Sequence, residues 1–373
     1  MKYRNERVAD LRHLLRMTQG ELAASVEMNA SYLSKIENDQ RVLTKDIVTK
    51  LALRHRIPTS FFLTADPIDN FAAPTFRKKA SSTVKESRYV EVLQKLAMRL
   101  FHIASLDTDY TKWTSPVADN VTDPEEAAKQ AREFFGLGPT DAVRNVTRLL
   151  ERNGAGVITN LSPATIEEVS LNHHGITRPS AQDDRPLVAL FDSGRGDVNR
   201  LTTAHELGHL IFDAQGERIE TRAQEARAFR FGGAFLLPQE VAREWISHDL
   251  PLSGYLAIKA QYGISVSAAI RRGKDLGLID HDRYRSLMIQ HSTRGWRHNE
   301  PGNVEPETAL LVPQALRHAW PTNTVPSAAT ATGIPARLIS EWSGLPESST
   351  PSPQRDENPG VISLADARAK RAA

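Results

Sequence analysis

Apolar residues recur at helical spacing over residues 5–64, in short segments separated by breaks of two to four residues. Residues 65–87 then interrupt this pattern with two prolines and a polar, basic run. We therefore predict a helical domain over residues 1–64, followed by a linker and helical connector over residues 65–122.

Longer helices and a few short strands are predicted further along the chain. Apolar spacing predicts a helix over Tyr89–Ile103, and the aspartate–proline pair at 123–124 is typical of the start of another. Short apolar runs at 155–159 and 187–191 are candidate strands, and the second leads directly into a predicted helix over 201–213. The fold class is therefore expected to be mainly α with a small β-sheet (α+β).

The second half of the chain continues in this helical manner. A helix is predicted over residues 220–237, then three short helices over 252–290 that form a subdomain. Residues 123–305 are expected to form one domain, and residues 306–346 a helical C-terminal segment. The polar, proline-dotted tail at 347–373 is expected to be disordered.

Composition narrows the chemistry. The 373-residue chain contains no cysteine, which excludes disulfides, thiolate catalysis and cysteine-ligated metals. Any metal must then be held by His, Asp, Glu or backbone oxygens. The N-terminus has no apolar core typical of a signal peptide, and no run approaches the roughly 18 apolar residues of a spanning helix. We expect a cytoplasmic protein without membrane contact.

Charge is nearly balanced over the chain but not at its N-terminal end. The net charge is +2, whereas residues 1–64 hold eleven Lys and Arg against seven Asp and Glu, an excess of four. A modest positive bias suits a domain that faces phosphate groups.

The stretch from Thr18 to Asn38 has the pattern of two short helices joined by a tight turn. Thr18 is a natural N-cap, and small Ala23 allows the two helices to cross closely. Leu33 and Ile36 are the expected buried residues of the second helix. This arrangement predicts a helix-turn-helix, with a plain helical protein-interaction module as the alternative.

The exposed positions of the second helix carry polar side chains that can reach base edges and phosphates. The candidate DNA-binding residues are Ser31, Tyr32, Ser34 and Lys35, together with Gln19 at the positive end of the first helix. About sixty residues here resemble the XRE-type (phage-repressor-like) helix-turn-helix family. That resemblance implies a double-stranded DNA operator and is compatible with a homodimer. The sequence departs from it at Glu27, where the family usually has a glycine in a left-handed turn.

A candidate metal site lies in the stretch His205-Glu206-Leu207-Gly208-His209. Histidines four positions apart on a helix differ by about 40° around its axis, so His205 and His209 can grip one ion. Glu206 lies where it can take a proton from a water at that ion, as a catalytic general base. Gly208 removes a side chain that would crowd a facing helix.

A third ligand is expected from the next helix. Projected on a helix, Glu225 shares a face with small residues including Gly232, which indicates close approach to the His205 helix. Glu225 is therefore the preferred third ligand, with Glu220 as the alternative. Two neutral histidines and one carboxylate favour Zn²⁺ with an open position. His173, His174 and Arg200 are candidates to stabilise an oxyanion, and the sequence does not choose among them.

A second family resemblance includes the metal motif and the segments around it. The apolar strand at 185–191, the helix around His205, and the run from Glu225 to Pro238 resemble the ImmA/IrrE family of metallopeptidases, over roughly residues 125–305. It implies a zincin-like fold with His205, His209 and Glu225 as zinc ligands and Glu206 as the catalytic glutamate. It also implies cleavage of a partner repressor in response to stress or a mobile-element signal.

Two functions are therefore open. The first is a DNA-tethered zinc endopeptidase that inactivates a regulatory protein by limited cleavage. The second is a DNA-binding regulator whose zincin domain is a non-catalytic sensor or interaction module. The complete set of histidines, glutamate and acidic ligand favours the first.

Overall fold

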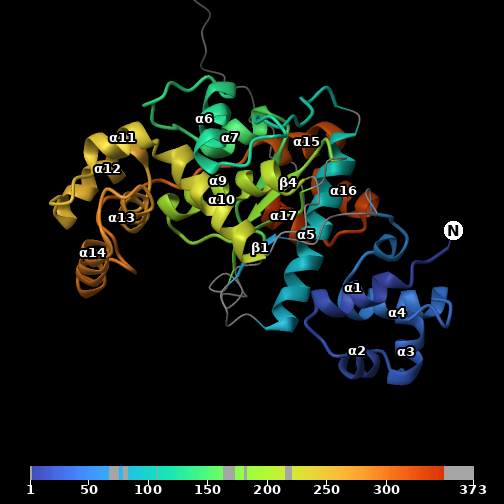
Figure 1. The fold of residues 1–373 in the computed structure, drawn as a ribbon. Coiled ribbons are helices and arrows are strands. Elements are labelled where there is room, and N and C mark those ends of the chain that lie inside the picture. Colours follow the sequence, from blue (N-terminus) through green and yellow to red (C-terminus); the bar gives the residue numbers. More distant parts are fainter. Residues whose placement is uncertain are drawn as a thin grey trace, which may run out of the picture.

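The computed structural model describes residues 2–66, 75–78, 83–106, 108–162, 173–179, 183–214 and 221–347. It shows a mainly helical α+β protein with a helix-turn-helix domain at one end (Figure 1). Within these ranges, each helix is either too short or too polar to serve as a membrane span. The predicted disordered tail lies outside the described residues from position 348 onward.

The N-terminal domain consists of short helices around a small apolar core. Its elements are α1 (Glu6–Leu14), α2 (Gln19–Ser25), α3 (Ala30–Glu37), α4 (Lys45–His55) and the 3-10 helix η1 (Thr59–Phe62). Thr18 caps α2 by accepting a hydrogen bond from the backbone N–H of Glu21, whose side chain binds back to Thr18 N–H. Glu27 adopts a left-handed φ of 56°, in the turn where a glycine is usual.

Helix α5 (Val84–Ser105) connects this domain to the rest of the molecule. Thr83 and Glu86 form a capping box that begins the helix five residues before the predicted start at Tyr89. In Figure 1, α5 runs from the N-terminal domain into the centre of the protein. Its apolar side chains belong to the same core as those of α1 and α4, so the N-terminal domain is packed against α5 and not merely tethered to it.

The central domain is built around a four-stranded sheet with the order β1-β3-β4-β2. The strands are β1 (Thr75–Lys78), β2 (Gly156–Ile158), β3 (His173–Thr177) and β4 (Leu187–Leu190). β2 pairs with β4 in parallel, whereas β3 is antiparallel to both β4 and β1. The predicted strands at 155–159 and 187–191 are thus present, and β1 and β3 are strands that the apolar pattern did not indicate.

Helices cover both faces of this sheet. The helices that share a core with one face are α6 (Pro124–Phe134), α7 (Val146–Arg152), α9 (Gly196–Phe212), α10 (Thr221–Leu236) and α11 (Gln239–Trp245), whereas α5 packs on the other face. Along β4, Leu187 and Ala189 pack into the core shared with α5, while Val188 and Leu190 pack into the core shared with α9. This alternation is the period of two expected for a strand buried on both sides.

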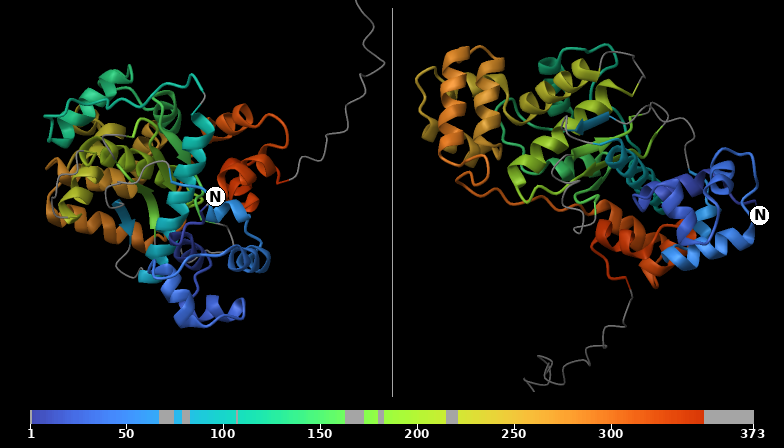
Figure 2. Two further views of the ribbon diagram at one scale, coloured as in Figure 1. Left: turned by 90° about the vertical axis from the view of Figure 1, so that its right-hand side faces the viewer. Right: turned by 90° about the horizontal axis from the view of Figure 1, so that it is seen from below.

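Two helical groups complete the molecule. The first, at the end opposite the N-terminal domain, contains η2 (Leu252–Gly254), α12 (Tyr255–Tyr262), α13 (Val266–Asp275) and α14 (His281–Thr293) (Figure 1). The second contains α15 (Leu311–Ala319), α16 (Thr324–Thr332) and α17 (Ala336–Ser343). In Figure 2 this C-terminal group lies beside the N-terminal domain, and its apolar residues join the core of α5.

Candidate metal centre and nucleic-acid interface

Three side chains from two helices converge at one point. His205 and His209 project from α9, and Glu225 projects from α10, with one candidate ligand atom of each within 4.8 Å of the others. The two histidine Nε2 atoms are 3.1 Å apart. The Glu225 carboxylate lies 3.3 Å from His205 Nε2 and 3.4 Å from His209 Nε2. Glu220, the alternative ligand from the sequence, lies outside the described residues.

Small residues allow α9 and α10 to approach this closely. A Cβ placed on Gly208 would lie 3.0 Å from the Cα of Ala228, and one on Gly232 would lie 3.1 Å from the backbone nitrogen of His205. The expectation that glycines mark the contact between the two helices is therefore met at Gly208 and Gly232. Gly233 serves a different place, because a Cβ there would approach only Arg272, at 3.7 Å.

A carboxylate behind the site orients His209. The Nδ1 of His209 is 2.6 Å from Asp213 Oδ2, and Arg227 donates a 2.8 Å hydrogen bond to the other oxygen of Asp213. This contact turns His209 Nε2 toward His205 and Glu225. Asp213 was not assigned this role from the sequence, although its position four residues after His209 on the same helix was the available signal.

Burial and neighbouring charges shift the pKa values of His209 and Glu225 in opposite directions. Burial lowers the pKa of His209, but hydrogen bonds to Asp213 and Glu225 raise it to about 10. Burial raises the pKa of Glu225, but the two histidines lower it to about 2. The carboxylates of Asp213 and Glu225 therefore stabilise positive charge at the point where the three side chains converge.

This donor set fits a divalent cation. Two imidazole nitrogens that face each other at 3.1 Å repel through their lone pairs unless a proton or a cation lies between them. Two histidines and one carboxylate, oriented by an outer carboxylate, are a ligand set that zinc accepts. Glu225 remains 25% exposed, so the site is reachable from solvent.

Glu206 lies between α9 and strand β3. Its side chain is completely buried, and a Cβ on Gly175 of β3 would come within 2.6 Å of Glu206 Oε1. Only glycine leaves room for the carboxylate at this strand position. The backbone of β3 therefore runs directly along the carboxylate adjacent to the first candidate ligand.

A cavity of about 300 Å³ opens beside the candidate metal ligands. Its lining residues are His205, Glu225, Ala226, Phe229, Arg230 and Arg271. The guanidinium of Arg271 lies 5.8 Å from the centre of the Phe229 ring. Arg230 and Arg271 are thus cationic groups beside the site, and the sequence reasoning did not single out either one.

The structure describes the side chains of two of the three residues considered for oxyanion stabilisation. His174 is a half-buried residue of β3, directly before Gly175. The side chain of His173 lies outside the described residues. Arg200 donates hydrogen bonds to the carbonyls of Val143 (2.5 Å) and Gly263 (3.2 Å), which makes it a structural residue.

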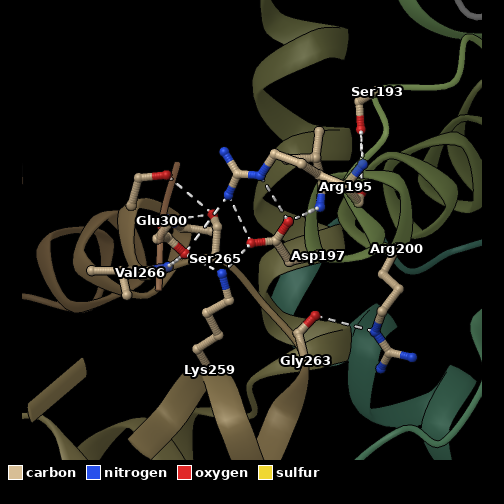
Figure 3. A network of polar contacts seen from close by, with 12 residues as sticks. Ser193, Arg195, Asp197, Arg200, Lys259, Gly263, Ser265, Val266 and Glu300 are labelled. Atoms are coloured by element: carbon tan, nitrogen blue, oxygen red, sulfur yellow. Dashed lines mark hydrogen bonds and ion pairs between the residues drawn. The ribbon is translucent and has the colours of Figure 1, made fainter. Parts of the chain in front are cut away.

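A buried charge network holds the N-terminal half of α9 against α12 and α13 (Figure 3). Lys259 Nζ is 2.9 Å from Asp197 Oδ2 and 2.8 Å from Glu300 Oε1. Glu300 also accepts a 2.9 Å hydrogen bond from the backbone N–H of Val266. Charges that are buried this fully must be paired with each other. Here the pairing fixes the position of the first turn of α9, the helix that carries His205 and His209.

The second helix of the helix-turn-helix presents the predicted DNA-binding residues at the far end of the molecule (Figure 1). Ser31 and Lys35 on α3 are exposed, while Tyr32 and Ser34 are half-buried. The guanidinium of Arg41 lies over the ring of Tyr32, 4.7 Å from its centre. Arg41 adds a positive group next to α3 that the sequence reasoning did not identify.

Gln19 is engaged inside the domain. Its Nε2 donates a 2.7 Å hydrogen bond to Glu37, which also accepts hydrogen bonds from Arg12 at 2.8 and 2.9 Å. This cluster links the start of α2 to the end of α3, and so sets the angle between the two helices. A phosphate contact by Gln19 would require its side chain to leave Glu37.

These features define a DNA-binding regulator with a metallopeptidase-like domain, and comparison with family models agrees. A model described as Helix-turn-helix matches residues 8–62, and one described as IrrE N-terminal-like domain matches residues 161–274. The chain thus joins an XRE-type helix-turn-helix to an ImmA/IrrE-type domain. A search of the curated proteins finds no match to it.

Proposed function

We propose that this chain is a DNA-binding transcription regulator whose IrrE-like domain is a zinc-dependent endopeptidase. Its substrate is a partner regulatory protein, a repressor, cut in response to stress or a mobile-element signal. The observation that carries this proposal is the convergence of His205, His209 and Glu225 next to the buried carboxylate of Glu206.

Each residue has a distinct part in the proposed reaction. Zinc, when bound by His205, His209 and Glu225, supplies positive charge that polarises the scissile carbonyl and lowers the pKa of a water. Glu206 takes the proton of the attacking water and passes it to the leaving amine. Asp213 keeps His209 in the orientation needed for binding, and Gly175 leaves the space that Glu206 occupies.

The enzymatic proposal is tested by incubating the full chain with a library of extended peptides. We expect hydrolysis that stops when the metal is removed by a chelator and returns when Zn²⁺ is added. If the chain binds zinc but hydrolyses neither the library peptides nor candidate repressors, the enzymatic proposal is wrong. The hypothesis of a non-catalytic sensor or interaction module would then remain.

Replacing Glu225 by alanine is expected to remove zinc. Loss of an outer partner of a metal ligand already lowers affinity by about 10- to 100-fold, so loss of a ligand should cost at least about 100-fold. Elemental analysis of the purified variant checks this, with Glu220→Ala as the matched control that keeps its metal. Equal zinc in the wild type and Glu225→Ala would remove Glu225 from the ligand set.

Replacing Lys35 by alanine should weaken operator binding. Lys35 is exposed on α3, and a lost phosphate contact lowers affinity almost uniformly across sequences and reduces the salt slope by about 1. Operators selected from random DNA, followed by gel shifts at several salt concentrations, measure both effects. Lys129→Ala, which removes the same charge from α6 in the central domain, is the control. Identical salt slopes for wild type and Lys35→Ala would contradict this assignment.

A further inference from the structure

We propose that strand β1 occupies, within the same chain, the position that an extended substrate segment takes beside the catalytic glutamate. β1 would then be an intramolecular competitor, which a substrate must displace. This inference rests on the proposed peptidase function, because it concerns how that site is filled and opened.

The first observation is where β1 lies. It comes from the connector between the helix-turn-helix domain and α5, yet it pairs antiparallel with β3 in the central domain. Figure 2 shows this blue strand among the green elements of that domain. The matched IrrE-like range begins only at residue 161, so β1 is supplied by a part of the chain outside it.

The second observation is what the paired strand touches. Phe76 lies opposite Ile176 and Lys78 opposite His173, so the register of β1 brackets Gly175. Gly175 is the residue whose backbone packs against Glu206. β1 therefore passes beside the segment of β3 that borders the proposed general base.

The third observation is that a peptide can pair with only one edge of β3 among the described residues. Its other edge is paired with β4, through Gly175 opposite Leu190 and Ile176 opposite Ala189. An extended peptide binds a sheet by adding main-chain hydrogen bonds at an open edge. A substrate segment read by β3 must therefore use the edge that β1 occupies.

The segment 67–82, which contains β1, has more residues than are needed to span the distance between its two ends. Asp66 is 3.1 Å from Lys95 of α5, and the chain returns to the start of the same helix at Thr83. Twelve residues of helix span about 18 Å, whereas the 16 connector residues between Asp66 and Thr83 can extend beyond about 50 Å. The chain between Asp66 and Thr83 is therefore long enough for β1 to reach β3.

The closing experiment uses the full chain with Glu206→Gln, so that binding is measured without cleavage. In one variant, residues 75–78 are replaced through Thr75→Gly, Phe76→Ser, Arg77→Gly and Lys78→Ser. The probe is a fluorescent peptide with the sequence of residues 73–80, followed by anisotropy. A short tether gives an effective concentration on the order of 1 mM, so a probe of about 0.1 mM affinity should bind the variant about tenfold more tightly.

A second variant tests the pairing without removing the strand. Thr75 lies opposite Thr177, and paired strand residues are close enough for a disulfide, so Thr75→Cys with Thr177→Cys should cross-link in this cysteine-free chain. The oxidised form should lose probe binding and the reduced form should regain it. Failure to cross-link, or equal probe binding by both forms and by the replaced strand, overturns the inference.

This design separates the inference from the proposed function. Probe binding that depends on β1 in the Glu206→Gln chain, together with no measurable hydrolysis by the zinc-loaded chain that keeps Glu206, would support the competitor and end the peptidase proposal. Hydrolysis by the chain that keeps Glu206, with probe binding that does not depend on β1, would support the peptidase proposal and overturn the competitor.

Discussion

Glu206→Gln is expected to lower peptide hydrolysis by about 10²- to 10⁴-fold while zinc content and DNA binding stay unchanged. The amide keeps the size and most of the shape of the carboxylate, so the contact with Gly175 survives. What it loses is the capacity to accept the proton of the attacking water. Glu206 is completely buried and does not belong to the group of candidate ligands, so the metal should remain.

The measurement compares initial hydrolysis rates of the two proteins at equal zinc loading. Glu240→Gln, an exposed glutamate at the start of α11, is the matched control and should hydrolyse at the wild-type rate. A Glu206→Gln variant that retains hydrolysis would assign proton transfer to another group. One that loses zinc would place Glu206 among the ligands.

Asp66→Ala should destabilise the contact between the helix-turn-helix domain and α5 by about 3–5 kcal/mol. Asp66 is 3.0 Å from Arg7 and 2.5 Å from Arg99, and both arginine side chains are completely buried. Lys95 lies 3.1 Å from the same carboxylate. Removing the acid leaves buried positive charge with too few partners, which costs more than the pair itself contributes.

Denaturant unfolding of wild type and variant measures this loss. The control is Asp46→Ala on α4, whose pair with Lys50 is largely exposed and should change stability by less than about 1 kcal/mol. Equal midpoints for Asp66→Ala and Asp46→Ala would show that the cluster does not hold the domain to α5.

The same cluster should make this contact sensitive to acid. Burial raises the pKa of Asp66, but Arg99, Arg7 and Lys95 outweigh it and hold the pKa below its usual 3.8. A carboxyl whose pKa is depressed by folding contributes stability at neutral pH. That contribution is lost as the pH falls below 3.8 and through the folded-state pKa, and Asp66→Ala should lack this part of the acid dependence.

Local features were the most predictable from the sequence. The caps at Thr18 and Asp123, the helix spacing of α5 and the four-residue interval between His205 and His209 all depend on neighbours within about one helical turn. The close approach of α9 to α10 was also predictable, because glycine destabilises the interior of a helix unless a neighbouring helix packs closely against it.

The sheet was predicted less completely. β2 and β4 are uninterrupted apolar runs buried on both faces, which is a strong signal. β3 contains two histidines and a glycine, and β1 lies in a segment whose prolines and basic residues favour a linker. β1 is a strand because it pairs with β3, and β3 is a strand because it pairs with both β1 and β4. Pairing partners far apart in sequence leave no periodic pattern in the chain.

What the sequence determined by itself was the pair of chemistries: a helix-turn-helix from capping and apolar spacing, and a candidate metal site from histidines one turn apart. Only the tertiary structure decided that Glu225 meets those histidines, that Asp213 orients one of them, and that β1 lies along β3. The physical reason is range. Helical geometry relates residues within a turn, whereas the meeting of distant segments depends on how whole faces pack.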